Sequence, residues 1–204
     1  MATDSPGRGA LAGNLLYTLA WLVGRLPLRA LWRLGDAWAW LAWRLRIREA
    51  RVAEVNLRLL QPEAGTDERA AAARPVLRGT GRQIFETLRF WTRPGGDNLA
   101  RIRAVLGEAH FRQALAAGRG LIVAAPHYGN WELLNQWLAA NTPIAIVYRP
   151  PDSAAMDHFL RRVRGRANVE QVRAEAAGVR QLFRTLKSGG VLGILPDQQP
   201  KAGE

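Results

Sequence analysis

Residues 120–132, which read GLIVAAPHYGNWE, decide the fold of this chain. The run at 121–125 is apolar, follows a glycine and has the length of a buried strand. A short polar loop then leads to Trp131, where an apolar segment of helical spacing begins. A short buried strand that passes through a loop into a helix is the repeating unit of a layered α/β sheet.

Towards the carboxyl terminus, short β-rich runs continue to alternate with helical ones. We expect further strands at 144–148, 169–172 and 191–195, and helices at 131–140, 154–166 and 178–187. This order predicts an α/β fold with a layered sheet flanked by helices. Residues 196–204 follow directly on the last predicted strand, so we also expect the C-terminal part of the sheet to be missing from this sequence.

Towards the amino terminus, the pattern is helical. A charged helical segment runs from Arg46 to Leu60 and stops before Pro62, and a new helix starts near Thr66 and continues to a turn at 93–96. We therefore predict three regions, which are a membrane-associated segment at 1–46, a helical region at 47–119 and an α/β catalytic core at 120–204.

The amino-terminal segment has the composition of a chain seated at lipid headgroups. Five of the eight tryptophans lie within residues 21–43, interleaved with arginines. The uncharged run Ala10–Val23 has 14 residues and reaches about 21 Å as a helix, which is less than a bilayer core of about 30 Å. We predict two helices, joined at Pro27, that lie on a membrane or dip into it.

Three alternatives remain for this segment. A cleaved signal peptide is disfavoured, because Gly24-Arg25-Leu26-Pro27 lacks small residues at the cleavage positions. Two amphipathic helices that pack on their own domain are possible, although a small core rarely needs five clustered tryptophans. Nucleic-acid binding is less favoured, because the basic residues are spread through apolar sequence.

Composition narrows the classes of function. The chain of 204 residues carries 29 basic and 17 acidic side chains, a net charge of +12, and only two of the basic residues are lysines. Arginine suits phosphate, so we expect an anionic partner, namely a nucleic acid, an anionic lipid or a phosphorylated substrate. The absence of cysteine excludes disulfides, cysteine-bound metals and thiol nucleophiles.

The loop after the first predicted strand carries a histidine and a carboxylate that can form a general-base pair. His127 and Glu132 can meet only if a helix starts between them, and Gly129 followed by Asn130 at the N-cap provides that start. Glu132 would then accept from one imidazole nitrogen, fix the tautomer and leave the other nitrogen to take a proton from an attacking hydroxyl.

Three other interpretations of His127 compete with a general base. The first is a structural histidine that is simply hydrogen-bonded. Metal binding needs more ligands than His110 and His158 offer, because both lie in helical, arginine-containing contexts and are expected at the surface. A serine triad is disfavoured because no Gly-x-Ser-x-Gly elbow is present. We therefore expect no metal and no cofactor.

Polar and basic residues that follow the predicted strands complete a pocket. Parallel strands end at one edge of a sheet, where ligands usually bind. Arginines gathered there suit a phosphorylated substrate or a phosphopantetheine-linked donor, although solvated surface charge is the default for any single one. The expected substrate-binding residues are Asn130, Arg149, Arg164, Arg166 and Asp197.

The stretch His127–Glu132 resembles the H-x4-D/E motif of the lysophospholipid acyltransferase superfamily. Most of the chain resembles one branch, the late acyltransferases of lipid A biosynthesis, which are lauroyl and myristoyl transferases. Besides that motif, the features shared in order are the hydrophobic amino terminus, Asn56-Leu57 with Pro62-Glu63, Glu86 with Trp91, 147–150, Arg164 with Arg166, and 195–198. Family members continue beyond the last of these through further sheet and a Phe-rich motif.

The resemblance implies a glycerolipid acyltransferase-like fold and an enzyme at the cytoplasmic face of a Gram-negative inner membrane. It implies transfer of a fatty acyl chain from acyl carrier protein to a hydroxyl of a lipid A precursor. His127 would be the base, Glu132 its orienting carboxylate and Arg164 an arginine needed for activity. Arg149 and Asp197 match positions that line the same cleft.

Two other functions stay open at this point. One is a related membrane acyltransferase with another lipid acceptor, such as a lysophospholipid or an ornithine lipid. The other is a non-enzymatic, basic membrane-surface or nucleic-acid-binding module, which predicts salt-dependent binding to DNA or RNA and indifference to loss of Glu132. With the family resemblance, no nucleic-acid partner is expected.

Overall fold

The computed structural model describes residues 6–165 and 168–197. It divides into two compact units. One unit combines the chain up to Leu19 with the chain from Phe90 onward, and the other spans Ala20–Arg89. The predicted divisions at 46/47 and 119/120 stay predictions, and the first part of the amino-terminal helix belongs to the unit that contains the sheet.

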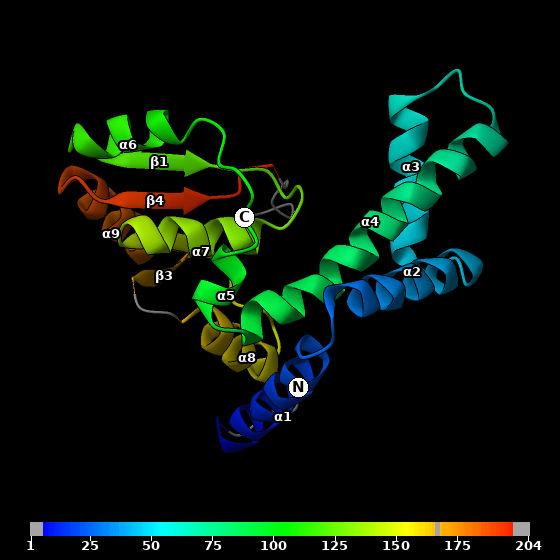
Figure 1. Ribbon diagram of the computed structural model, residues 1–204, viewed down its shortest axis with the longest axis horizontal. Coiled ribbons are helices and arrows are strands. Elements are labelled where there is room, and N and C mark those ends of the chain that lie inside the picture. Colours follow the sequence, from blue (N-terminus) through cyan, green and yellow to red (C-terminus); the bar gives the residue numbers. More distant parts are fainter. Residues whose placement is uncertain (1–5, 166–167, 198–204) are drawn as a thin grey trace. The chain divides into compact units, whose positions relative to one another are not determined.

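The sheet has four parallel strands in the order β1-β4-β2-β3. Strands β1 and β4, although far apart in sequence, lie side by side (Figure 1). All four predicted strands are confirmed to within one residue at their ends. They are β1 (Leu121–Ala124), β2 (Ile144–Tyr148), β3 (Val169–Arg173) and β4 (Val191–Ile194).

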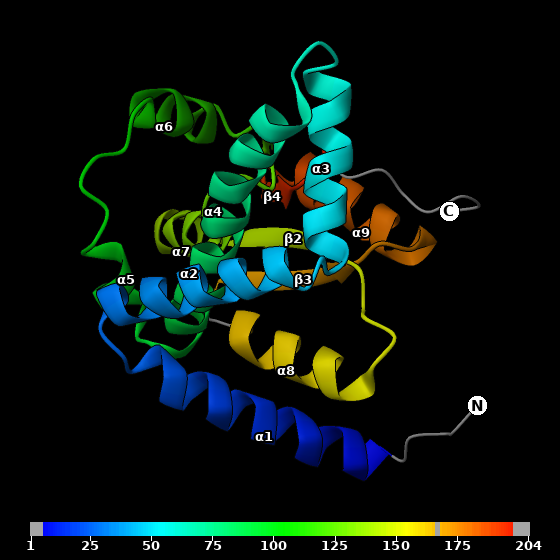
Figure 2. The ribbon, with the colours of Figure 1, turned by 90° about the vertical axis from the view of Figure 1, so that its right-hand side faces the viewer.

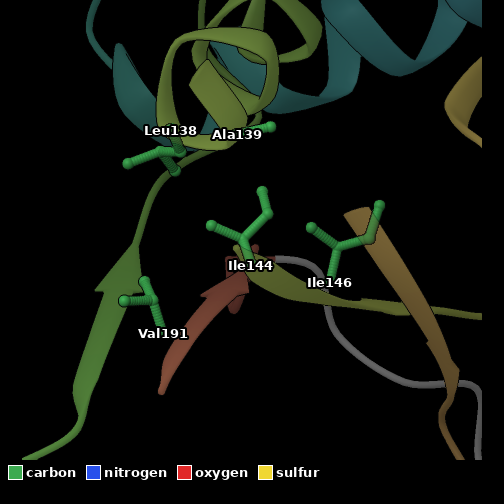
Figure 3. Close-up of a cluster of buried hydrophobic side chains, with 5 residues drawn as sticks. All are labelled: Leu138, Ala139, Ile144, Ile146 and Val191. Atoms are coloured by element: carbon green, nitrogen blue, oxygen red, sulfur yellow. The ribbon is translucent and has the colours of Figure 1, made fainter. Parts of the chain in front are cut away.

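Helices connect the parallel strands, as such connections require. They are α7 (Trp131–Asn141), α8 (Ala154–Arg164) and α9 (Ala176–Lys187). The side chains of Leu138 and Ala139 on α7 face Ile144, Ile146 and Val191 of the strands and form one core (Figure 3). Helix α6 (Glu108–Ala116) adds Phe111 and Leu115 to the same core.

Helix α9 packs against the sheet through a second core, in which Leu182 and Leu186 contact Ala145, Val172 and Leu192 of the strands. Helices cover both sides of the sheet, which is why β1, β2 and β4 read as continuous apolar runs, whereas β3, at the edge of the sheet, carries polar residues. The predicted start of this helix at 178 is two residues late.

The amino-terminal helix α1 (Pro6–Gly24) lies alongside α8 (Figure 2). A Cβ added at Gly9 would lie 3.0 Å from the Cβ of Ala154, and one at Gly13 would lie 2.8 Å from the Ala155 carbonyl oxygen. The two glycines, four residues apart, therefore form the face of α1 that lets the helices approach. Arg162 of α8 also donates to Asn14, at 2.6 Å.

A short helix, α5 (Gly95–Leu99), begins where the sequence predicted only a turn. Its Asn98 is fully buried and donates both to the Phe90 carbonyl oxygen, at 3.0 Å, and to Gln136 of α7, at 2.8 Å. Gln136 donates to the same carbonyl, at 2.8 Å. These bonds give the side-chain amide nitrogens of Asn98 and Gln136 buried acceptors and fix α7 against α5.

The second unit consists of α2 (Leu28–Arg44), α3 (Arg48–Leu60) and most of α4 (Thr66–Thr92) (Figure 1). Its core contains Ala39, Ala50 and Leu77, with Trp38 and Trp43 packed against them. Two of the five clustered tryptophans therefore pack on the core of this unit. The alternative of two amphipathic helices that pack on their own domain predicts such contacts. The predicted helix break at Pro27 and the helix start at Thr66 are confirmed.

Close contact of α2 with α4 comes from two glycines. A Cβ at Gly35 would lie 2.5 Å from the Arg82 backbone nitrogen, and one at Gly81 would lie 2.3 Å from the Gly35 oxygen. Beside them, the Arg82 guanidinium donates to both Asp36 oxygens at 2.6 and 2.7 Å. This hydrogen-bonded pairing lowers the pKa of Asp36 below its usual value.

Within the described ranges, no helix is both long enough and apolar enough to cross a membrane.

Candidate active site

A pocket of about 800 Å³ lies at the carboxyl ends of the strands, between the sheet and α7. Its apolar wall includes Val123, Leu134, Leu138 and Ile146. Three of the predicted site residues, His127, Arg149 and Arg164, line it together. His127 and Arg149 follow β1 and β2, which end at this edge of the sheet, and Arg164 is the last residue of α8.

His127 lies on the loop between β1 and α7. Gly129, two residues on, has a φ of +59°, a left-handed conformation that favours glycine, so the loop turns here as predicted. Asn130 occupies the N-cap position of α7, but its side chain makes no capping bond. The imidazole side chain keeps 29% of its surface exposed, so it is not buried among aliphatic residues.

Asp197 holds both the backbone and the side chain of His127. Its Oδ2 accepts from the His127 backbone N–H at 2.8 Å, and its Oδ1 lies 2.8 Å from Nδ1. Asp197 reaches His127 because it follows β4, the direct neighbour of β1 in the sheet. The hydrogen bond from the imidazole lowers the pKa of Asp197, which is therefore ionised at neutral pH.

An ionised carboxylate can only accept hydrogen bonds, so Nδ1 of His127 carries a proton and donates to Asp197. In the neutral ring, Nε2 then keeps a free lone pair. No partner for Nε2 is found among the residues that the structure describes. The imidazole is thus arranged as a proton acceptor that opens on the pocket.

The predicted pairing of Glu132 with His127 is not what the structure shows. Glu132 is only 4% exposed, and its Oε1 accepts from Nε and Nη2 of Arg164 at 2.8 and 2.6 Å. The carboxylate lies in the first turn of α7 and is directed at the end of α8. A buried carboxylate needs a cation, and Arg164 is the cation that this part of the fold supplies.

Trp131 lies between the two charged pairs. Its ring meets the His127 ring edge to face, with centroids 5.7 Å apart, and the Arg164 guanidinium lies 5.0 Å from the centroid of Trp131. Trp91 approaches the same guanidinium at 5.9 Å. Trp131 and Trp91 are not among the predicted site residues. An aromatic side chain at the first helical position, inside the motif, was the available indication.

The remaining predicted residues lie elsewhere. Asn130 lines a separate apolar groove of about 350 Å³ with residues of α6 and α7, and Arg166 falls outside the described residues. His110 is exposed as expected, whereas His158 is half-buried and its Nε2 lies 3.3 Å from Asn14 of α1. Across the described residues, no three histidines and carboxylates gather closely enough to hold a metal.

The sequence of this chain matches the model of one protein family and is similar to three known proteins. The model of the family described as bacterial lipid A biosynthesis acyltransferase matches residues 10–204. The lipid A biosynthesis lauroyltransferase of Escherichia coli (strain K12) is 30% identical over 177 residues, which cover 87% of this chain and 57% of that protein.

Two further relatives are less similar. The lipid A biosynthesis palmitoleoyltransferase of Escherichia coli (strain K12) and the lipid A biosynthesis acyltransferase of Shigella flexneri are each 27% identical over 181 residues. Each alignment again covers 87% of this chain and 57% of the relative. The chain thus spans a little over half the length of the relatives that it matches.

Proposed function

This chain belongs to the bacterial lipid A biosynthesis acyltransferase family, and on that premise we propose that it transfers a fatty acyl chain to a hydroxyl of a lipid A precursor. The donor is the thioester of acyl carrier protein, and no further cofactor or metal takes part. The observation that carries the proposal is His127, whose Nδ1 is held by Asp197 and whose side chain lines the pocket.

In this mechanism, Nε2 of His127 takes the proton of the acceptor hydroxyl while its oxygen attacks the thioester carbonyl carbon. The carbonyl oxygen becomes an oxyanion as the tetrahedral intermediate forms. When the intermediate collapses, the carbon–sulfur bond breaks and the imidazolium returns its proton to the departing thiolate. The products are an ester and the free thiol of the carrier, so protons and charge balance.

Asp197 stabilises the charged imidazolium that forms during the reaction. It already accepts the Nδ1 hydrogen bond, so no group has to reorient when the positive charge appears. In this proposal Glu132 acts through Arg164 and not on the histidine. The pair fixes one guanidinium in the wall of the pocket, close to the reacting atoms.

The two sides of the pocket suit the two parts of an acyl thioester. The apolar wall, with Leu134, Leu138 and Ile146, suits a fatty acyl chain. Arg149 and Arg164 at the other side suit an oxyanion or a phosphate group. This arrangement supports acyl transfer rather than a module that binds nucleic acid.

We further propose that the protein works at the cytoplasmic face of the inner membrane. One face of α1 presents Leu11, Leu15 and Leu19, which are 73%, 61% and 51% exposed. These side chains recur at helical spacing and point away from the glycine face that packs on α8. Such a stripe suits a helix that lies in the interfacial layer of a bilayer.

The test is acyl transfer from radiolabelled acyl carrier protein to a lipid A precursor, with the product identified by mass spectrometry. We expect His127→Ala to lower the rate by about 10²-fold or more, because general-base catalysis contributes roughly 10²–10⁴-fold. His110→Ala, at an exposed position on α6, is the matched control and should keep the parent rate.

The lauroyltransferase of Escherichia coli serves as the positive control for the assay. The proposal is wrong if this chain shows no transfer while that enzyme is active. Equal rates for His127→Ala and the parent would remove the histidine from the mechanism. A product acylated on another lipid would keep the chemistry and replace the acceptor.

A further inference from the structure

A second pocket, of about 400 Å³, lies within the three-helix unit and has no part in the proposed acyl transfer. We call it the arginine pocket. It is formed by the end of α2, the following turn, the first half of α3 and one position of α4. The residues that line it are Trp40, Trp43, Arg44, Arg46, Ala50, Arg51, Glu54 and Arg74.

The arginine pocket carries an unbalanced positive charge. Four guanidinium groups face a single carboxylate, that of Glu54, which Arg46 already contacts at 3.1 Å. Arg74 lies over the Trp43 ring at 5.6 Å. The side chains of Arg44 and Arg51 have no partner among the described residues. Two of the four cations are thus free to bind an anion.

The arginine pocket lies at the turn between α2 and α3. Arg46 has a φ of +48°, in the left-handed region that side chains rarely adopt, and lies in the turn that brings α2 and α3 together. Arg51 follows in the first turns of α3, whose N-cap residue, Ile47, offers no side-chain capping bond. Glu49 in the first turn of α3 complements the positive end of the helix dipole, but it does not line the arginine pocket.

The surroundings of the arginine pocket are apolar and exposed. Trp40, which lines it, is 65% exposed. Leu41 on the same helix is 47% exposed, and Leu45, the C-cap residue that follows α2, is 63% exposed. Helical spacing places Trp40, Leu41 and Arg44 within one side of α2. An anion held here is therefore bordered by tryptophan and leucine, which favours a lipid over a water-soluble ligand.

We propose that the arginine pocket binds the phosphate group of an anionic membrane lipid. Arg44 and Arg51 donate to the phosphate oxygens, and Arg74, stacked on Trp43, completes the cationic wall. Trp40 and Leu45 insert among the neighbouring acyl chains. This site needs neither His127 nor Asp197, so it goes beyond the proposed enzymatic activity and can be tested apart from it.

The test uses the full chain and sedimentation with two kinds of vesicle, phosphatidylcholine alone and phosphatidylcholine mixed with phosphatidic acid. We expect tighter binding to the mixed vesicles. The double variant Arg44→Gln with Arg51→Gln should lose about tenfold or more of that extra affinity, because each arginine at an anionic lipid surface contributes severalfold.

The matched control is Arg33→Gln with Arg58→Gln. It removes the same charge from the same two helices, at exposed positions outside the arginine pocket. This control should keep most of the affinity of the parent. An equal loss in both double variants would show attraction by net charge alone and would overturn the proposal.

Two further binding measurements test whether the bound phosphate group belongs to a lipid, to free phosphate or to DNA. Inorganic phosphate in solution should bind far more weakly than the vesicles, since it lacks the acyl chains that Trp40 contacts, and phosphate binding as tight as vesicle binding would overturn the lipid assignment. Tighter binding to a DNA oligomer than to the mixed vesicles would also overturn the lipid assignment.

Two more variants test whether a loss of vesicle binding comes from the arginine pocket and not from unfolding or from the candidate active site. Circular dichroism checks that each double variant keeps its helices, and Arg74→Gln alone provides a second test should the first double variant unfold. The His127→Ala variant must keep its vesicle binding. Loss of binding in that variant would contradict the separation of the two sites.

Discussion

Trp131 separates two charged pairs that differ in exposure and in role. On one side, Asp197 and His127 form a pair that stays partly exposed, at 40% and 29% of their side-chain surfaces. On the other side, Glu132 and Arg164 form a buried pair, at 5% and 16%. Substitution of only one residue of a buried ion pair leaves the other charge buried without a partner, which lowers the free energy of unfolding by several kcal/mol. The exposed pair is free of that constraint, which suits a group that gains and loses a proton.

At the residue scale, we predict that Asp197→Asn lowers kcat for acyl transfer by about 10²-fold or more and leaves KM nearly unchanged. An amide does not stabilise the imidazolium and can hold the wrong tautomer of His127. Steady-state kinetics with acyl carrier protein as donor measure both constants.

The double variant Asp197→Asn with His127→Ala tests whether the two residues act together. If Asp197 acts through the imidazole, the double variant is no slower than His127→Ala alone. Additive losses would contradict this role and indicate a direct contact of Asp197 with the substrate.

At the element scale, the pairing of α1 with α8 connects the amino terminus to the candidate active site. Gly9 and Gly13 let the two helices approach, and α8 ends at Arg164 in the wall of the pocket. The cation–π contact of Arg162 with Tyr17, at 3.7 Å, reinforces the pairing. Helix α1 therefore supports the helix that positions Arg164, besides presenting its leucine face.

We predict that Gly13→Ala lowers the free energy of unfolding by about 1–3 kcal/mol, because the added methyl group would lie 2.8 Å from the Ala155 carbonyl oxygen. Gly7→Ala is the control, since nothing lies within 4 Å of its added Cβ. Alanine favours the helix, so this variant should be unchanged or up to about 1 kcal/mol more stable. Chemical denaturation checks both, and equal stability of the two variants would argue against close packing of α1 on α8.

At the scale of the whole molecule, we expect the net charge of +12 to make the protein sensitive to acid. Protonation of carboxylates leaves their arginine partners unbalanced and increases repulsion within the folded state. Asp36 is such a carboxylate, because the hydrogen bond from Arg82 lowers its pKa in the folded state. Its contribution to stability is complete above the unfolded pKa of about 3.9 and is lost as the pH falls through the lower folded value.

We therefore predict that Asp36→Asn is less stable than the parent at pH 7, by about 1 kcal/mol or less, since the side chains of the pair are 35% and 42% exposed. The difference should shrink below about pH 4 and disappear below the folded pKa. Thermal unfolding across this range measures it. Glu63→Gln, an exposed change of equal charge, is the control, and a difference that grew on acidification would contradict the assigned direction.

The residues of the loop His127–Asn130 show how far the sequence alone reaches. The strand before it, the helix after it and the turn at Gly129 were all predictable, because apolar runs, helical spacing and glycine act over a few neighbouring positions. The partner of His127 was not predictable. Asp197 lies 70 positions away and reaches the imidazole only because β4 is inserted beside β1.

By itself, the sequence determined the α/β order of elements, the helix break at Pro27 and the presence of a histidine and arginines at the strand ends. The tertiary structure alone decided the strand order, the pairing of Glu132 with Arg164, the docking of α1 on α8 and the grouping of four arginines in one pocket. The physical reason is the distance along the sequence over which each interaction acts. Propensity and periodicity act between near neighbours, whereas a buried charge or an exposed pocket depends on which distant segments the core brings together.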